Sequence, residues 1–146
     1  MLIATVSRLI RPKRIVHAHC DLPCGVYDPA QARIEAESIL AIQKKYQDAE
    51  NSKKDSETVE EFQERCIRIK EDRAELVKHH LWVLWTDYFK PEHTEQHPNL
   101  HDLFWEATKE AGESKRSTDP AQGQKLLDLI DQITDVFTAT ESGKAA

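Results

Sequence analysis

The sequence lacks long apolar runs and contains few cysteines and glycines, and each shortage excludes a class of protein. No stretch approaches the roughly 20 apolar residues that a membrane-spanning helix needs, so we expect a soluble protein without a membrane partner. Three cysteines in 146 residues do not make a disulfide framework, because an odd count leaves at least one thiol unpaired. With four glycines, the chain also has no glycine-rich phosphate loop.

Positive charge is distributed unevenly along the chain. Residues 1–18 contain four basic residues and no acidic one, whereas the whole chain has a formal net charge of -6 at pH 7. Removing those four positive charges would take the net charge to -10. A strongly acidic protein does not neutralise phosphates, so we expect no nucleic-acid partner.

The order of segments at the N-terminus differs from that of a secretory signal. Such a signal places basic residues before its apolar core, but here Met1–Ala4 precedes the basic cluster from Arg8 to Arg14. We therefore expect a cytoplasmic protein. Residues 1–18 are then either a pro-segment, removed by a processing protease after Ala18, or an ordinary disordered terminus.

Residues 19–27, with the sequence HCDLPCGVY, bring metal ligands together. The imidazole of His19 and the thiols of Cys20 and Cys24 lie within six residues, and cleavage after Ala18 would add a free α-amine. Amine, amidate and thiolate donors favour square-planar Ni(II) or Cu(II) over tetrahedral zinc. Electron-rich donors also bring Ni(III) within reach, with the imidazole as an axial ligand. We name this segment the hook and predict that it binds nickel and transfers single electrons.

Two residues shape the backbone of the hook. Pro23 restricts the turn between the cysteines, and an X–Pro bond is the usual place for a cis peptide where a loop folds back tightly. Gly25 relieves crowding just after the second thiol.

Beyond the hook, apolar residues recur at helical spacing in four segments, and no strand alternation or repeat is found. Asp-Pro signals precede the first and the last segment. The predicted helices extend from Pro29 to about Ala49, from about Ser56 to just before Pro91, from Pro98 to Gly112, and from Pro120 past Phe137. We expect an all-α domain over residues 19–146, an antiparallel four-helix bundle with an N-terminal metal-binding hook.

The second predicted helix has the longest apolar stripe, formed by Val59, Phe62, Cys66, Ile69, Leu76, Val83 and Leu84. Two charged residues also fall on inner faces, Glu35 on the first helix and Arg73 on the second. A lone buried charge costs several kcal/mol, so each should have a partner. They either pair with each other or serve a polar group nearby, unless either of them leans out to solvent.

The hook and three later segments resemble the nickel superoxide dismutase family. The matching runs are HCDLPCGVYDPAQARIEAES, RAELVKHH, LWTDYFKP and STDPAQGQK, and the similarity extends from His19 to about Phe137. The resemblance implies a pro-enzyme cleaved before His19 and a homohexamer of four-helix bundles with one nickel ion per subunit. The implied reaction converts superoxide to dioxygen and hydrogen peroxide by cycling between Ni(II) and Ni(III).

The resemblance also implies the ligands of the nickel ion. His19 would supply its α-amine and an axial imidazole, Cys20 its backbone amide and thiolate, and Cys24 its thiolate. Protons for the reaction would come from ordered water near Tyr27 or from a thiol of either cysteine, and the sequence does not choose between these sources.

Five further residues receive roles around the metal by the same resemblance. Asp21 and Tyr27 would complete the hook and its substrate gate, and Tyr88 would back Tyr27. Glu35 and Arg73 would hydrogen-bond around the axial imidazole. Because the substrate is an anion and the protein is acidic, local cations should steer it, and the candidates are Lys78 and Lys90.

Two alternatives remain open at this stage. The first is a noncatalytic helical metal-binding or thiol-redox module, in which Cys20 and Cys24 hold zinc or form a regulatory disulfide and residues 1–18 are retained. The second concerns an additional metal site, because three histidines are spaced by four. Prolines interrupt any continuous helix through His93, His97 and His101.

Overall fold

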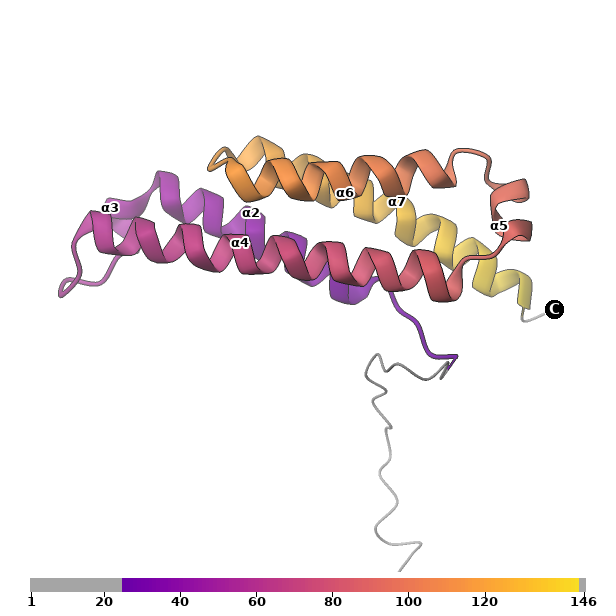
Figure 1. Ribbon diagram of the computed structural model, residues 1–146. Coiled ribbons are helices and arrows are strands. Elements are labelled where there is room, and N and C mark those ends of the chain that lie inside the picture. Colours follow the sequence, from indigo (N-terminus) through magenta and orange to yellow (C-terminus); the bar gives the residue numbers. More distant parts are fainter. Residues whose placement is uncertain (1–24, 145–146) are drawn as a thin grey trace, which may run out of the picture.

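The computed structural model describes residues 25–144, with side chains up to residue 140 (Figure 1). The elements are α2 (Ala30–Gln47), α3 (Ala49–Ser52), α4 (Val59–Val83), the π-helix η1 (Leu84–Tyr88), α5 (Pro91–Gln96), α6 (Leu100–Arg116) and α7 (Pro120–Lys144). Within these residues there is no strand. The expected pro-segment and the hook residues His19, Cys20, Asp21, Pro23 and Cys24 lie outside the described residues.

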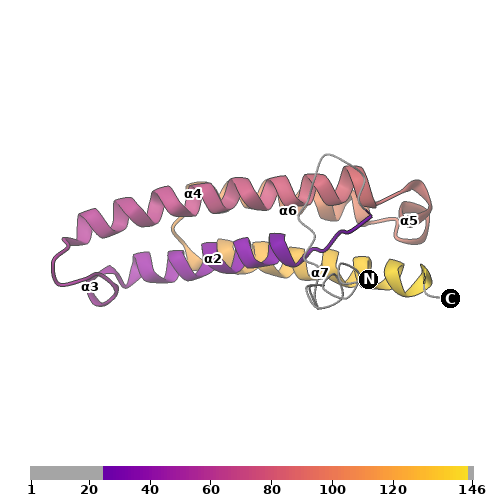
Figure 2. The ribbon, with the colours of Figure 1, turned by 90° about the horizontal axis from the view of Figure 1, so that it is seen from below.

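The four long helices form an antiparallel bundle. Helix α2 packs against α4 and α7, and α6 packs against the same two helices, so the four helices form a closed ring. Figures 1 and 2 show successive long helices running in opposite directions, with α3 at one end of the bundle and α5 at the other. The predicted all-α four-helix bundle is confirmed. None of the described helices is long and apolar enough to cross a membrane.

Polar side chains begin three of the long helices. The Oδ1 atom of Asp28 accepts a hydrogen bond from the backbone N–H of Ala30 at 2.8 Å. Asp119 accepts one from Ala121 in the same way at 2.9 Å. Thr58 and Glu61 form a reciprocal capping box at the start of α4. These contacts satisfy backbone N–H groups that a helix leaves unpaired at its first turn, so they fix where each helix begins.

The predicted apolar stripe of α4 was wrong in its middle. Ile69 and Leu76 are 38% and 36% exposed, while the buried positions at this level are Lys70, Ala74 and Val77. The buried line follows the helical period from Cys66 directly through Lys70. A prediction based on hydropathy does not place a lysine on the inner face, and it therefore shifts the predicted apolar stripe of α4 by one position.

The predicted limits of the third helix were also displaced. Helix α6 begins at Leu100 instead of Pro98, and it continues through Gly112 to Arg116. A glycine ends a helix when it adopts a left-handed conformation. Gly112 does not, because among the described residues Gly25 is the glycine with a positive φ.

The centre of the bundle is apolar, but its two ends differ. Fully buried side chains such as Ile39, Leu84 and Ile130 fill the middle. Toward the α3 end lies what we call the polar layer, formed by Gln43, Lys70 and Ser114–Ser117. Toward the α5 end lies what we call the aromatic end, formed by Tyr27, Tyr88, Phe89, His93 and Phe137.

Candidate metal centre

The described chain begins just after the second cysteine of the hook, and its first residue makes a turn. Gly25 has a φ of 70°, a conformation that residues with a Cβ rarely adopt. Two residues later the side chain of Tyr27 is half-buried, and Asp28 begins α2. The last residues of the hook thus enter the bundle through a turn at Gly25 and a capped start of α2.

Tyr27 lies against Tyr88, as the gate hypothesis requires. The two ring centroids are 5.7 Å apart and the ring planes are inclined at 59°. Tyr88 belongs to η1 and is only 5% exposed, whereas Tyr27 is partly open to solvent. Tyr27, the outer tyrosine, thus packs against Tyr88, the inner tyrosine, which is buried in the bundle. Sequence resemblance named both residues, and the structure brings them into contact.

The hydroxyl group of Tyr88 has a partner on the last helix. Its oxygen lies 2.7 Å from Oγ1 of Thr140. Thr140 is buried and also bonds to the carbonyl oxygen of Phe137 at 2.7 Å. Sequence reasoning missed Thr140, because a threonine near the end of an amphipathic helix carries no signal of its own. Only the packing of α7 beside η1 brings it to the tyrosine.

Glu35 and Arg73 form an ion pair between α2 and α4. Nη1 of Arg73 donates to Oε2 of Glu35 at 3.1 Å and more weakly to Oε1 at 3.4 Å. The Glu35 side chain is 15% exposed and that of Arg73 is 40% exposed. Of the options that the sequence left open, mutual pairing is the one observed. Arg73 retains donors that this contact does not use, since a guanidinium group has five N–H bonds.

The two candidate steering lysines have different surroundings. Lys78 lies 4.0 Å from Glu75, a carboxylate whose pKa is lowered by a hydrogen bond from Lys115. Lys78 and Lys115 thus share the single negative charge of Glu75, which offsets part of the positive charge of Lys78. Lys90 is exposed next to Phe89 and immediately precedes α5. Its position beside the aromatic end makes Lys90 the better candidate for attracting an anion.

The histidine cluster does not form a second metal site. His93 is buried, with its ring stacked on Tyr88 at 5.7 Å. His101 instead packs against Trp85 on another face. Among the side chains that the structure describes, those of residues 25–140, no group of three or more His, Cys, Asp or Glu could hold a metal ion.

The third cysteine is also unsuited to metal binding. Cys66 is buried in a small apolar cluster with Ala49 and Phe62, near the α3 end of the bundle. Burial raises the pKa of its thiol, so the thiolate that a metal requires is disfavoured. The expectation that Cys66 acts as a small apolar side chain is confirmed.

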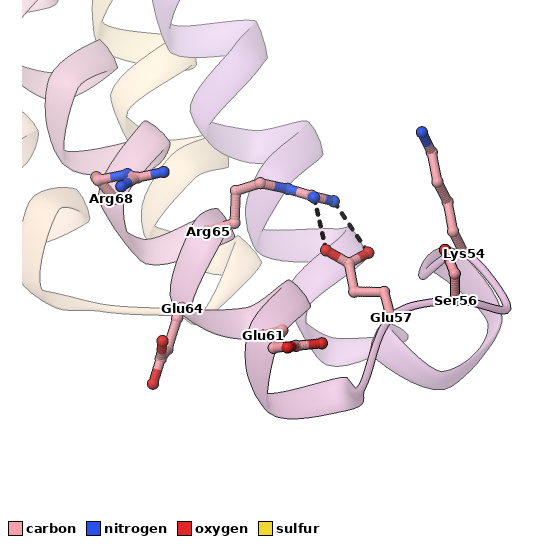
Figure 3. A pocket seen from close by; sticks show the side chains of 7 residues that line it. All are labelled: Lys54, Ser56, Glu57, Glu61, Glu64, Arg65 and Arg68. Atoms are coloured by element: carbon pink, nitrogen blue, oxygen red, sulfur yellow. Dashed lines mark hydrogen bonds and ion pairs between the residues drawn. The ribbon is translucent and has the colours of Figure 1, made fainter.

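A polar pocket of about 620 Å³ lies at the α3 end (Figure 3). Both charge signs line it, and its central contact is an ion pair of 2.6 Å between Arg65 and Glu57. The other lining residues are Lys54, Ser56, Glu61, Glu64 and Arg68. The aromatic end lies at the opposite end of the bundle, so this pocket is separate from the gate and contributes nothing to it.

Comparison with known proteins decides the family. The model of the family of nickel-containing superoxide dismutases matches residues 14–141. The chain belongs to the nickel-containing superoxide dismutase family. It is a nickel enzyme that converts superoxide to dioxygen and hydrogen peroxide.

Relatives of known sequence and structure agree with this assignment. The chain is 57% identical over 136 residues to a nickel superoxide dismutase of Streptomyces seoulensis, covering 93% of this chain and 98% of the relative. It is 54% identical over the same length to that of Streptomyces coelicolor. A native nickel superoxide dismutase structure superposes with a TM-score of 0.76 at 53% identity, covering 85% of this chain and 99% of its own.

The donor set of the hook fits nickel. Thiolates are soft, strongly donating ligands, and an amine with an amidate adds two nitrogen donors, a set that favours square-planar Ni(II) or Cu(II) over tetrahedral zinc. The described residues offer no competing cluster. The thiol groups of Cys20 and Cys24 and the nitrogen donors of His19 would therefore suit the metal of the family.

Proposed function

We propose that nickel in this chain is held by His19, Cys20 and Cys24, and that superoxide reacts there. One observation carries the proposal. A member of a nickel enzyme family needs a cluster of donors, and the side chains that the structure describes, those of residues 25–140, contain none, which supports the hook as their source. Bound nickel supplies a one-electron couple between Ni(II) and Ni(III), which thiolate and amidate ligands make accessible.

The reaction takes one electron from a first superoxide, and the enzyme must hold that electron until a second superoxide arrives. A first superoxide gives up an electron and leaves as dioxygen. A second superoxide accepts that electron and two protons and leaves as hydrogen peroxide. Tyr27 stands just before α2 and limits access to the proposed nickel site, with Tyr88 behind it. Ordered water held at Tyr27, or a thiol of Cys20 or Cys24, delivers the protons.

The ion pair between Glu35 and Arg73 would give the imidazole of His19 a fixed partner when nickel is bound. Glu35 accepts from Arg73 and still has lone pairs for an imidazole N–H. A carboxylate that orients a metal-bound histidine also raises the basicity of that ligand. Asp21, within the hook, completes the loop near the substrate. Together these residues position the His19 ring.

Maturation requires cleavage after Ala18, because the α-amine of His19 is one of the proposed ligands. The lengths of the relatives support this step. Curated relatives align over 93% of this chain with almost their whole length, whereas solved relatives align over 85% with 99% of theirs. The solved chains are therefore shorter than the curated ones, as removal of a leader would make them.

The mature enzyme is proposed to be a cytoplasmic homohexamer with one nickel ion per subunit. Support for assembly comes from exposed apolar surface as well as from the family. The indole rings of Trp82 on α4 and Trp105 on α6 are largely exposed and line a common hollow. Exposed aromatic groups of this kind are typical of subunit contacts.

The test is native mass spectrometry of the protein purified from its own host. The expected result is a subunit that begins at His19 and carries one nickel ion in a hexamer. Cys24→Ser should abolish nickel binding and activity. Cys66→Ser is the matched control, since it removes a thiol of the same chain that lies in an apolar cluster, and it should retain the metal. His19→Gln should retain the fold and lose most activity.

Other outcomes would favour the noncatalytic alternative. A subunit that retains residues 1–18 and carries zinc or no metal would indicate a metal-binding or thiol-redox module. Full activity of Cys24→Ser would exclude the proposed ligand set, and full activity of the uncleaved chain would exclude the α-amine as a ligand.

A further inference from the structure

The ring of Tyr88 is held from several sides. Its centroid lies 4.5 Å from that of Phe137, 4.9 Å from Phe89 and 5.7 Å from His93. Aromatic contacts at these separations favour particular orientations of the rings. Because Tyr88 is also 5% exposed, the ring has little freedom, and the position of its hydroxyl group is set by the packing.

The direction of the hydrogen bond between Tyr88 and Thr140 follows from proton counting. A threonine hydroxyl group has one proton, and that of Thr140 is donated to the carbonyl oxygen of Phe137 at 2.7 Å. Oγ1 of Thr140 can therefore only accept at its second contact, 2.7 Å from the oxygen of Tyr88. The phenolic proton of Tyr88 must lie between these two oxygens.

We infer that Thr140 is a positioning residue for the gate: by accepting the phenolic proton of Tyr88, it leaves the Tyr88 oxygen able to act only as an acceptor toward other groups. The inference rests on the proposed gate roles of Tyr27 and Tyr88. It assigns donor functions at the gate to Tyr27, the outer tyrosine. Thr140 itself touches neither metal nor substrate.

Loss of this acceptor would change the hydrogen bonding of the gate without removing any ring. The phenolic proton of Tyr88 would then need another partner. The ring of Tyr27, at the end of the hook, is close, with its centroid 5.7 Å from that of Tyr88. A Tyr88 hydroxyl released from Thr140 could donate to a water or anion at the proposed gate that otherwise receives a hydrogen bond from Tyr27 alone. Substrate handling should suffer while the fold and the nickel site remain.

The experiment compares three variants of the nickel-loaded enzyme. Thr140→Val removes the acceptor and keeps the branched shape, and Thr140→Ser restores it. Thr134→Val is the matched control, because Thr134 bonds back to Ile130 on the same helix at 2.9 Å without touching a tyrosine. If Thr140→Val does not fold, Thr140→Ala removes the same acceptor.

The first measurement is ultraviolet resonance Raman spectroscopy of the tyrosine doublet, whose intensity ratio reports whether a phenol donates or accepts. The chain has three tyrosines, so Tyr27→Phe and Tyr46→Phe assign the signal of Tyr88. The signal of Tyr88 should be that of a donor in the wild type, and Thr140→Val should change its intensity ratio in both nickel-loaded and nickel-free protein. Thr140→Ser and Thr134→Val should keep the wild-type ratio.

The second measurement is the steady-state rate. Thr140→Val should lower kcat/KM by about three- to tenfold, the range that one neutral hydrogen bond covers, with unchanged nickel content. Thr140→Ser should recover most of the loss. An unchanged doublet in Thr140→Val overturns the direction of the bond, and a changed doublet with full activity overturns the positioning role. A wild-type protein without nickel or activity would instead refute the proposed function, while the doublet still tests the bond.

Discussion

The polar layer and the aromatic end bury polar atoms in different ways. In the polar layer, the ammonium group of Lys70 donates to the carbonyl oxygens of Ser114 and Lys115, and Gln43 donates to that of Ser117. These bonds join α2 and α4 to the last turn of α6. At the aromatic end, the buried bond runs between the side chains of Tyr88 and Thr140.

The difference separates stability from function. Bonds to backbone carbonyls at a helix end satisfy groups that would otherwise be unpaired, so they stabilise the bundle whatever the hook contains. The bond at the aromatic end instead orients one side chain, that of Tyr88, behind the proposed gate. Substitutions in the polar layer should therefore affect unfolding, and substitutions near the hook should affect turnover per nickel ion.

Lys70→Ala should have the largest effect on stability. Lys70 is 2% exposed, so the change leaves a cavity and deprives two carbonyl oxygens of their donor. We expect a loss of about 2–4 kcal/mol in the free energy of unfolding, measured by urea denaturation at fixed protein concentration. Activity per bound nickel should not change. Lys109→Ala, at an exposed position of α6, is the control and should lose under about 0.5 kcal/mol.

Gly123→Ala should come next, because α7 passes close to α2 at this point. A Cβ atom on Gly123 would lie 3.0 Å from Cα of Leu40 and 2.2 Å from Oε1 of Gln43. Overpacking of this kind costs about 1–3 kcal/mol, readable as a lower urea midpoint. Gly112→Ala is the matched change, since its Cβ would meet only the Lys78 side chain, at 3.7 Å. It should stabilise the protein by about 0.5–1 kcal/mol, and equal effects of the two changes would contradict the close approach.

Arg73→Gln should have a smaller effect on stability and a large one on turnover. A half-exposed ion pair contributes under about 1 kcal/mol to folding, but the proposed support of His19 should make activity fall by about tenfold. Arg33→Gln is the control, because Arg33 forms a comparable pair with Asp131 between α2 and α7 at 2.7 Å. Equal activities of the two variants would show that Arg73 serves only to join helices.

The smallest effect is a pH dependence of the polar layer. Burial lowers the pKa of Lys70 from its ordinary value of 10.5. Between the lowered pKa and 10.5 the unfolded chain binds more protons than the folded one, so the free energy of unfolding rises with pH in that window. Lys70→Met lacks this titration. The stability of the wild type relative to Lys70→Met should therefore increase as the pH is raised from neutral toward 10.5, in urea titrations of both proteins. A decrease would show that Lys70 is charged more readily in the fold than in water.

The sequence predicts well what depends on local chemistry. Asp28 and Asp119 begin helices as their Asp-Pro signals indicate, and the segments with periodic apolar residues are helical. Family motifs locate Tyr27 and Tyr88 before any contact between them is known. The pairing of Glu35 with Arg73 was one of several options, because the relative rotation of two helices is not encoded in either of them alone.

The sequence could not predict which polar side chains are buried. Lys70 is an inner residue because the end of α6 lies opposite it and supplies carbonyl acceptors. The sequence near Lys70 does not indicate that the end of another helix will lie there. The role of Thr140 likewise depends on a distant contact, because its partner Tyr88 lies 52 residues away along the chain. Both cases are polar residues whose partners come from another helix.

The bond between Tyr88 and Thr140 has a consequence for the order in which the molecule is made. The hook ends at Tyr27, whereas the acceptor for the inner tyrosine is Thr140 on α7. A growing chain thus carries its proposed metal ligands while the four long helices are made, before Tyr88 has its acceptor. A truncation that removes Thr140 would act on the proposed gate from a position far in sequence from the ligands.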